Sequence, residues 1–376
     1  MPETILSIRG LRTYFYTYAG VVRALEGIDL DIYNGETIGL VGETGCGKSV
    51  TSLSIMRLVP DPPGRIVGGE IIFKDEDLLK KSEEEMQAIR GSQITMVFQD
   101  PMTFINPVLT VGDQVSEVIT LHQDLAREAV QTKIDEIQEK IMQIDPSSPD
   151  RQQLMERVKE LEAIKEHPPK PSKGEIKKAA LHRTIEVLKL VQLPNPEDVV
   201  RQYPHELSGG MRQRAIIAMA LSCNPDLLIA DEPTTSLDVT IQAQILALLS
   251  ELKRKIGSSV LIITHDMGIV AETCDRVGVM YAGNIVEVAE TKALFKKPLH
   301  PYTQGLLRAI PKLHEDVKDL EIIPGSVPNL IHPPSGCRFH PRCPFRMEIC
   351  DKEFPPMVET APGHSVACYL YPEKKH

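Results

Sequence analysis

The chain has 376 residues, of which 42% are hydrophobic and 25% charged, and its net charge is −10. This length exceeds one ordinary core and predicts two or three domains or subdomains. The acidic balance argues against nucleic acid as the main partner, because phosphate binding requires a basic face. No run reaches the roughly 18 apolar residues of a membrane span, and the N-terminal sequence lacks an export pattern. We therefore expect a cytoplasmic globular chain with reduced cysteines.

Short apolar runs bounded by turn residues predict buried strands of a largely parallel sheet. Helical stretches between them predict an α/β fold with helices on both faces of the sheet. The expected strands are 37–41, 70–73, 94–98, 227–230, 260–264, 277–281 and 285–288. The expected helices are 49–58, 210–222 and 240–255.

The segment 124–183 has a different composition, with 12 acidic and 12 basic residues and neither cysteine nor aromatic residues. Its apolar residues recur at 4-3 spacing, which is typical of a narrow helical seam. The seam residues are Val130, Ile134, Ile137, Ile141 and Ile144, then Leu154, Val158 and Leu161 after a Pro-Ser turn. We predict a helical hairpin ended by the proline-rich segment 167–171; a flexible charged loop is the alternative.

Residues 42–49 read Gly-Glu-Thr-Gly-Cys-Gly-Lys-Ser, the pattern of a phosphate-binding loop between a strand and a helix. Glycines let backbone N–H groups approach phosphates, and the helix N-terminus adds partial positive charge. Lys48 is expected to neutralise the β- and γ-phosphates, and Ser49 to ligate Mg²⁺. We interpret Cys46 as a small spacer, with a reactive thiol as the alternative. The expected ATP-binding residues of the loop are Gly42, Glu43, Thr44, Gly45, Cys46, Gly47, Lys48, Ser49 and Val50.

An apolar strand at 227–230 ends in two carboxylates, Asp231 and Glu232. Asp231 is expected to hold Mg²⁺, and Glu232 to act as general base on the attacking water. A turn or helix-start signal is the other interpretation of such a pair.

Between these two halves lies Leu207-Ser-Gly-Gly-Met-Arg-Gln213, which opens a predicted helix and resembles an anion-binding N-terminus. One nucleotide does not need two such helix starts. A second one has a purpose if it binds the ATP of a partner.

These motifs, in this order, resemble those of ATP-binding cassette (ABC) proteins. The resemblance implies a RecA-like phosphate-loop core, a helical subdomain, and two cassettes that sandwich each ATP head to tail. It assigns Ser208, Gly209, Gly210 and Gln213 to the partner's ATP. The remaining family motifs match Gln99 (catalysis and Mg²⁺), Asp238 in the D-loop Ser236-Leu237-Asp238, His265 (catalytic switch) and Phe15 (adenine stacking, with Tyr14 or Tyr16 as alternatives).

Within this family, the chain resembles the D-type ATPases of oligopeptide and dipeptide importers. The resemblance is carried by Met102-Thr-Phe-Ile-Asn-Pro-Val-Leu-Thr-Val-Gly112, by Lys297-Pro-Leu-His-Pro-Tyr-Thr-Gln-Gly-Leu-Leu307 and by Ile323-Pro-Gly-Ser-Val-Pro-Asn329. It implies a distinct F-type ATPase partner, two transmembrane permeases and, indirectly, an extracellular solute-binding protein. The chain would then sit peripherally on the cytoplasmic face of the membrane.

Four of the seven cysteines, Cys337, Cys343, Cys350 and Cys368, lie in the last forty residues. Four thiolates suit either an iron–sulfur cluster or structural zinc. The spacings lack the close Cys-x2-Cys pairs of zinc ribbons, and the peptide-importer resemblance implies [4Fe–4S]. A metal-free segment is the third alternative.

The expected organisation has four parts. Residues 1–98 form the first half of the ABC core, and 99–202 the helical subdomain with the insertion at about 124–183. Residues 203–290 complete the core, and 291–376 form a small C-terminal extension.

Other functions fit the sequence less well. A nickel or oligosaccharide importer has a similar ATPase. A soluble ABC ATPase of DNA repair or translation would carry two cassettes, whereas this chain has one. A redox sensor with an inactive cassette is disfavoured because Lys48, Ser49, Asp231, Glu232 and His265 are all present.

Overall fold

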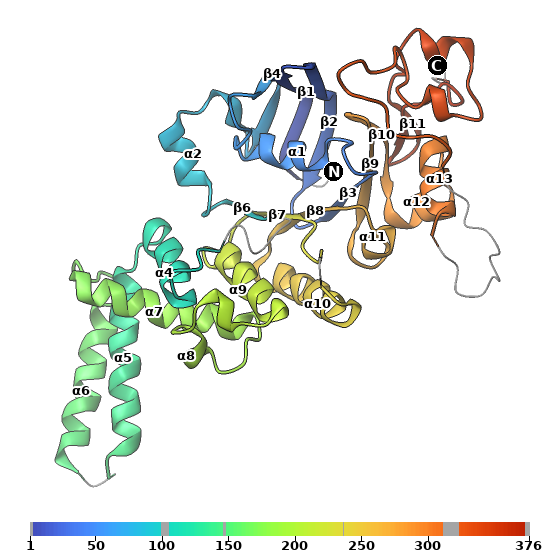
Figure 1. Ribbon diagram of the computed structural model, residues 1–376. Coiled ribbons are helices and arrows are strands. Elements are labelled where there is room, and N and C mark those ends of the chain that lie inside the picture. The colour runs from blue at the N-terminus through green and yellow to red at the C-terminus, as the bar shows by residue number, and fades with distance from the viewer. Residues whose placement is uncertain (1–2, 99–104, 146–147, 236, 311–322, 373–376) are drawn as a thin grey trace.

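The computed structural model describes residues 3–98, 105–145, 148–235, 237–310 and 323–372 (Figure 1). Its centre is an eight-stranded sheet with the order β11-β12-β10-β9-β3-β8-β7-β6. Strands β9, β3, β8, β7 and β6 are parallel, and the others are antiparallel. The strands are β3 (Thr37–Val41), β6 (Ile94–Val97), β7 (Leu227–Asp231), β8 (Ser259–Thr264), β9 (Arg276–Tyr281), β10 (Asn284–Glu290), β11 (Val358–Ala361) and β12 (His364–Val366).

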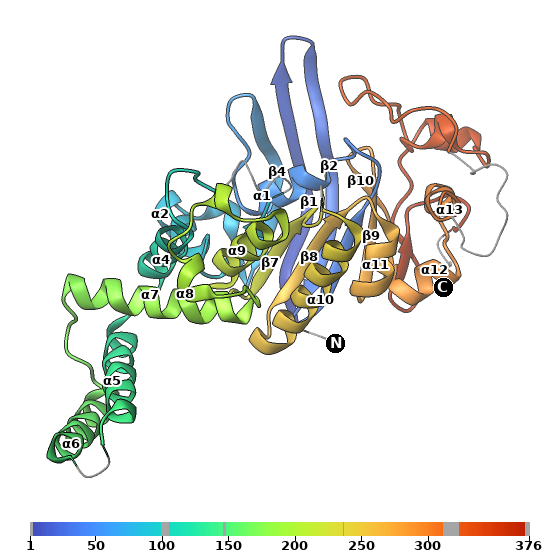
Figure 2. The same ribbon diagram turned by 60° about the horizontal axis from the view of Figure 1, so that its bottom comes forward.

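The central parallel strands are buried on both faces, which explains their continuous apolar sequence. In β7, Leu227 and Ile229 face one hydrophobic core, and Leu228 faces the other. Helices α10 (Val239–Ile256) and α11 (Met267–Thr273) cover one face, as Figure 2 shows, and α1 (Lys48–Ile55) lies on the other. The predicted α/β class is therefore confirmed.

A second, antiparallel sheet with the order β2-β1-β4-β5 packs over α1. Its strands are β1 (Thr4–Thr17), β2 (Gly20–Tyr33), β4 (Gly64–Phe73) and β5 (Glu76–Asp77). The prediction that 70–73 joins the parallel sheet is wrong, because β4 pairs with β1. The sequence-based prediction also missed the two longest strands, β1 and β2, whose exposed and buried residues only partly alternate.

The helical subdomain contains α4 (Val111–His122), α5 (Ala126–Gln143), α6 (Pro149–Ile164), α7 (Lys173–Leu190), α8 (Pro196–Val199) and α9 (Gly209–Leu221). Helices α5 and α6 form a hairpin that projects away from the rest of the molecule (Figure 1). A separate small core holds the hairpin together, and it consists of the predicted seam residues Val130, Ile134, Val158 and Leu161 with Ile137 and Ile141 at its edge. Two helices with a shared core thus lie where the sequence predicts a helical hairpin.

Helix α7 starts after the proline-rich segment, at a capping box formed by Ser172 and Glu175. Its residues Ala179 and Ala180 belong to the main core. The expected insertion, 124–183, therefore includes the first turns of a helix that anchors the hairpin to the subdomain.

The C-terminal segment contains α12 (Thr291–Lys296), α13 (Pro301–Arg308), and short 3₁₀ turns at His340–Arg342 and Glu348–Asp351. It continues the main sheet, because β12 pairs with β10 at Glu287 and Val288. Cys337, Phe339 and Cys350 also belong to the main core. The expected appended domain is thus built onto the cassette, beside β10 (Figure 1).

The remaining short elements are α2 (Glu83–Ile89) and 3₁₀ turns at Leu78–Lys80 and Pro204–Glu206. Within the described ranges, no helix has the length and apolar character needed to cross a bilayer.

Candidate nucleotide-binding site

The predicted phosphate loop joins the end of β3 to the start of α1. At two positions of the loop only glycine fits, because a side chain would clash with neighbouring atoms and because φ is positive. Gly42 has φ 156°, and an added Cβ would lie 2.1 Å from the carbonyl oxygen of Met280. Gly47 has φ 109°, and a Cβ there would lie 2.7 Å from the carbonyl oxygen of Ala24. The loop is therefore pressed against β2 and β9, and larger residues would displace it.

Lys48 is the first residue of α1 and is buried. Its Nζ donates to the carbonyl oxygens of Gly42 at 2.7 Å and Glu43 at 3.2 Å. These bonds hold the ammonium group over the loop, where the phosphates of a nucleotide would lie. The neighbouring Cys46 is fully buried, and this burial raises the pKa of its thiol, which supports its interpretation as a spacer. Thr44 and Gly45 are exposed at the loop tip.

Asp231 ends β7 next to the phosphate loop. Its carboxylate accepts hydrogen bonds from Ser49 Oγ at 3.2 Å and from Ser52 Oγ at 3.4 Å. Burial raises the pKa of Asp231, and the charge of Glu232 adds to this effect. A divalent cation at this position would relieve the burial cost by pairing with the carboxylate.

Glu232 follows in a left-handed conformation with φ 47°. Its carboxylate accepts a hydrogen bond from Thr235 Oγ1 at 2.9 Å and lies 3.1 Å from Nδ1 of His265. Burial favours the protonated acid, but the contacts with His265 and Thr235 outweigh burial, so the pKa of Glu232 is lowered. The two neighbouring carboxylates thus have opposite pKa shifts, a pattern common in sites with divided roles.

Ser208 caps α9 by accepting from the N–H of Met211 at 3.4 Å, and Ser208 and Gly209 are exposed. The structure places Gln213 away from the exposed start of α9. Its side chain is fully buried and donates to the carbonyl oxygen of Pro233 at 2.6 Å. In this conformation Gln213 links α9 to the loop after β7, and the exposed face is left to Ser208 and Gly209.

Asp238 caps α10 by accepting from the N–H of Ile241 at 2.9 Å. Gln99 and Ser236 lie outside the described residues, as do Met102, Thr103 and Phe104. Phe15 pairs with Gly64, where a Cβ would come within 2.7 Å of its ring. Tyr14 donates to Glu26 at 2.6 Å, whereas Tyr16 is exposed.

The geometry of a phosphate loop facing an Asp-Glu strand end agrees with the comparison of this chain with known families. The family described as ABC transporter matches residues 25–235. This chain belongs to the ABC transporter family. A second family, described as oligopeptide/dipeptide transporter, C-terminal region, matches residues 286–350. The expectation of an ABC ATPase with a C-terminal region of the peptide-transporter type is confirmed.

Several relatives match almost the whole ABC chain. The dipeptide transport ATP-binding protein DppD of Bacillus subtilis (strain 168) is 44% identical over 372 residues, 99% of this chain and 96% of its own. The oligopeptide transport ATP-binding protein AppD of the same organism is 43% identical over 372 residues, which are 99% of this chain and 98% of its own. Among solved structures, the ADP- and phosphate-bound dimer of the ATP-binding cassette MJ0796 has a TM-score of 0.56 at 22% identity, and the match covers 76% of this chain and 98% of that chain. This last similarity shows the fold.

The four C-terminal cysteines of this ABC protein line one small cavity together with Phe339 and Tyr369. All four are free thiols. Burial raises the pKa of Cys337 to about 12 and that of Cys368 to about 11, and the neighbouring thiols add to both shifts. Such thiols stay neutral unless a positive centre stabilises the thiolates.

A single zinc ion requires its four thiolates to lie close together. Four thiolates at about 2.3 Å from zinc lie within about 4 Å of one another. Elsewhere in the described part of the chain, the carboxylates of Glu128 and Glu186 and the ring of His182 lie within 4.8 Å of one another.

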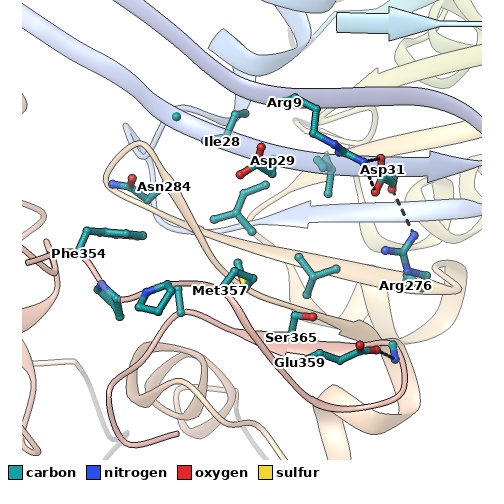
Figure 3. Close-up of a pocket in the computed structure, with 18 of the residues that line it drawn as sticks. Arg9, Ile28, Asp29, Asp31, Arg276, Asn284, Phe354, Met357, Glu359 and Ser365 are labelled. Carbon is teal, nitrogen blue, oxygen red and sulfur yellow. Dashed lines mark hydrogen bonds and ion pairs between the residues drawn. The ribbon is translucent and has the colours of Figure 1, made fainter. Parts of the chain in front are cut away.

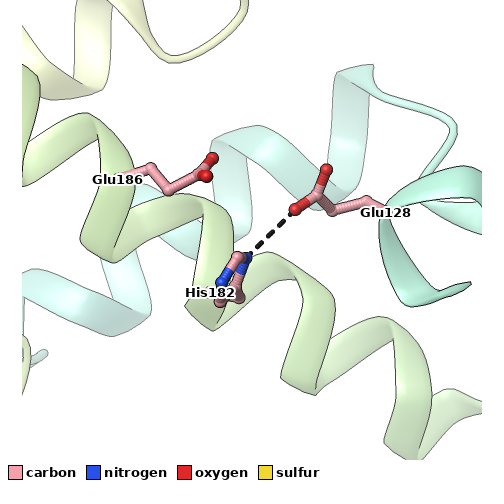
Figure 4. Close-up of side chains that lie close together, drawn as sticks. All are labelled: Glu128, His182 and Glu186. Carbon is pink, nitrogen blue, oxygen red and sulfur yellow. Dashed lines mark hydrogen bonds and ion pairs between the residues drawn. The ribbon is translucent and has the colours of Figure 1, made fainter. Parts of the chain in front are cut away.

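Glu128, His182 and Glu186 lie where α5 meets α7, at the base of the hairpin (Figure 4). His182 Nδ1 is 3.2 Å from Glu128, and its Nε2 is 3.5 Å from Asp135. Glu186 is paired with Arg183 at 2.9 Å. We interpret this group as a polar junction that holds the hairpin on α7.

A cleft also lies between β2, β10 and the C-terminal segment (Figure 3). Phe354 and Met357 form one wall. The charged groups of the opposite wall bind one another. Arg9 pairs with Asp31 at 2.6 Å, and Arg276 donates to the carbonyl oxygen of Asp31 at 3.2 Å. None of the residues expected to bind ATP or metal lies in this cleft.

The sequence-based prediction missed four residues that contact the site. Ser52 follows Ser49 by one helical turn, and Thr235 follows Glu232 by three residues, so spacing could have identified both. Tyr302 and Arg342 reach the phosphate loop from the C-terminal segment, and no local pattern predicts these contacts.

Proposed function

We propose that this ABC ATPase powers the uptake of oligopeptides or dipeptides through partner permeases. The observation that carries the proposal is the match of residues 286–350 to the C-terminal region of oligopeptide/dipeptide transporters. Relatives that align with 98–99% of the chain are named as dipeptide, oligopeptide and peptide transport proteins. The solute itself is selected by other subunits in such a system.

In this proposal the site residues have separate roles. Lys48 neutralises phosphate charge, and Ser49 and Asp231 hold Mg²⁺, which balances the charge of the phosphates. Glu232 accepts a proton from the attacking water, since its lowered pKa keeps it ionised at neutral pH. His265 positions Glu232, and Gln99 completes the expected set. The 3.1 Å contact between His265 and Glu232 supports this division.

We also propose that the cassette works with a second ATPase of the F type, docked on two permeases at the cytoplasmic face of the membrane. The exposed Ser208 and Gly209 at the start of α9 support a contact with the ATP of that partner. No nucleic acid partner is proposed, since the net charge is −10.

The thiol cavity is proposed to hold a [4Fe–4S] cluster on Cys337, Cys343, Cys350 and Cys368. The sequence spacing of these cysteines lacks the close Cys-x2-Cys pairs of zinc ribbons, which favours a cluster over a single zinc ion. Such a cluster would supply structural bracing to a segment in which the described strands and turns are short.

The transport proposal is tested with the complete complex in proteoliposomes. Uptake of a labelled dipeptide and of a labelled pentapeptide should require ATP on the side of the membrane where the cassette lies. Uptake should stop when Glu232 is replaced by Gln in the complex. Uptake of nickel or an oligosaccharide with no peptide uptake would refute peptide as the solute. The ATPase assignment would stand in that case.

A further inference from the structure

Arg342, in the four-cysteine segment, contacts Glu43 of the phosphate loop across 299 residues of sequence. Its Nη1 lies 2.8 Å from Oε2 of Glu43, and its Nη2 lies 3.1 Å from Oε1. The Arg342 side chain is 6% exposed and that of Glu43 30%. Two parallel charge-assisted bonds fix both the distance and the orientation of the pair.

The guanidinium group of Arg342 is also fixed on its other sides. It donates to the carbonyl oxygens of Pro324 at 2.9 Å and Ile323 at 3.2 Å, and to the hydroxyl of Tyr281 at 3.3 Å. With the two bonds to Glu43, this accounts for five hydrogen bonds, which is the donor capacity of an arginine. Arg342 is therefore a rigid support for Glu43.

Tyr302 makes a second contact from the C-terminal segment. The backbone N–H of Glu43 donates to its hydroxyl at 2.8 Å. Tyr302 is fully buried, and its ring packs against Tyr281 at 4.6 Å and Phe339 at 5.5 Å between centroids. Both the backbone and the side chain of Glu43 are thus held from outside the loop.

Glu43 in turn determines the shape of the loop that follows it. Its carbonyl oxygen accepts from Lys48 Nζ at 3.2 Å and from the N–H of Cys46 at 3.3 Å. A continuous series of bonds therefore runs from Arg342 through Glu43 to Lys48, the residue expected to face the phosphates.

We propose that Arg342 is a positioning residue for nucleotide binding, and that through Glu43 the C-terminal segment keeps the phosphate loop and Lys48 in the shape that accepts ATP. A loop ordered beforehand loses less freedom when ligand binds, so affinity is higher. The inference rests on ATP binding by the cassette and does not depend on the transported solute or on the identity of a metal.

The experiment compares full-length Arg342→Gln and Glu43→Gln proteins with wild type. Each variant should weaken binding of a fluorescent ATP analogue about tenfold, which is about 1.4 kcal/mol. In the assembled transporter, KM for ATP should rise while kcat changes less than about twofold, as expected when ground state and transition state lose the same interaction. The double variant should be no weaker than either single variant, because both remove one shared contact.

Arg346→Gln is the matched control, because Arg346 lies in the same segment, pairs with Asp351 and is 52% exposed. It should leave the Kd for ATP unchanged. Arg342→Lys keeps the charge without the bidentate geometry, and its Kd should fall between wild type and Arg342→Gln.

A Kd within about twofold of wild type for Glu43→Gln would overturn the proposal, as would fully additive effects in the double variant. If Arg342→Gln fails to fold, as judged by thermal melting, Glu43→Gln decides the matter. Glu43 is the more exposed member of the pair, and Glu43→Gln retains the size of the side chain, so this variant is expected to fold.

Discussion

Nδ1 of His265 lies 3.1 Å from Oε1 of Glu232, although 33 residues separate them. The contact brings the residue after β8 to the residue after β7, two parallel neighbours in the main sheet. Thr235 holds the other oxygen of the carboxylate at 2.9 Å. Glu232 is therefore oriented from two sides by groups of its own chain.

Replacing Glu232 with Gln should stop steady hydrolysis while ATP still binds. The amide retains the size of the side chain but cannot accept the proton of water, and general-base catalysis contributes roughly 10²–10⁴-fold. Phosphate release should fall at least about 100-fold, with the Kd for ATP within about threefold of wild type. Full turnover by this variant would show that another group is the base.

Replacing Thr235 with Val should move the acidic limb of the rate profile to higher pH. Thr235 donates to the ionised carboxylate and helps to lower the pKa of Glu232. Loss of this bond raises that pKa, so the base becomes protonated, and activity falls, at a higher pH than in wild type. Measurement of kcat from pH 4 to 8 tests this.

The matched control is Thr235→Ser, which keeps the hydroxyl and should keep the wild-type profile. A profile for Thr235→Val that coincides with wild type would show that this hydrogen bond does not control the ionisation of Glu232.

Anaerobic purification should yield a brown protein with broad visible absorption and bound iron and sulfide. Substitution of Cys343 by Ser should remove the colour, because the cavity then lacks one of its four thiols. Cys223→Ser is the control, since Cys223 lies against the carbonyl oxygen of Val118 in the helical subdomain. A colourless wild-type protein with one bound zinc would refute the cluster.

Replacing Leu161 with Ala should loosen the projecting hairpin and leave the nucleotide site intact. Leu161 is 4% exposed in the small core that the hairpin keeps for itself. Removal of a buried leucine side chain costs about 2–5 kcal/mol. Hydrogen exchange should accelerate in α5 and α6, while the Kd for ATP stays unchanged.

Met155→Ala is the control, because Met155 is 49% exposed on the same helix as Leu161. Slow exchange that persists in the Leu161→Ala hairpin would mean that other contacts hold α5 and α6 together.

The sequence by itself determined which residues are expected to bind and hydrolyse ATP and the order in which they occur along the chain. A phosphate loop requires glycines and lysine at fixed spacing, and a buried parallel strand requires a continuous apolar run, so both are visible locally. Asp231 and Glu232 could be placed at a strand end for the same reason. The hairpin was predictable because its core repeats every three or four residues along its own helices.

Only the tertiary structure decided which distant residues meet. Gln213 is polar and lies near an expected contact surface, yet helix packing buries it against Pro233. β4 joins an antiparallel sheet by pairing with β1, a strand far from it in the sequence, and not with the parallel strands. Arg342 reaches Glu43 because Tyr302 and Phe339 of the C-terminal segment pack against Tyr281 at the end of β9, beside the phosphate loop. Such contacts depend on how complete elements pack, and no periodicity within one segment records them.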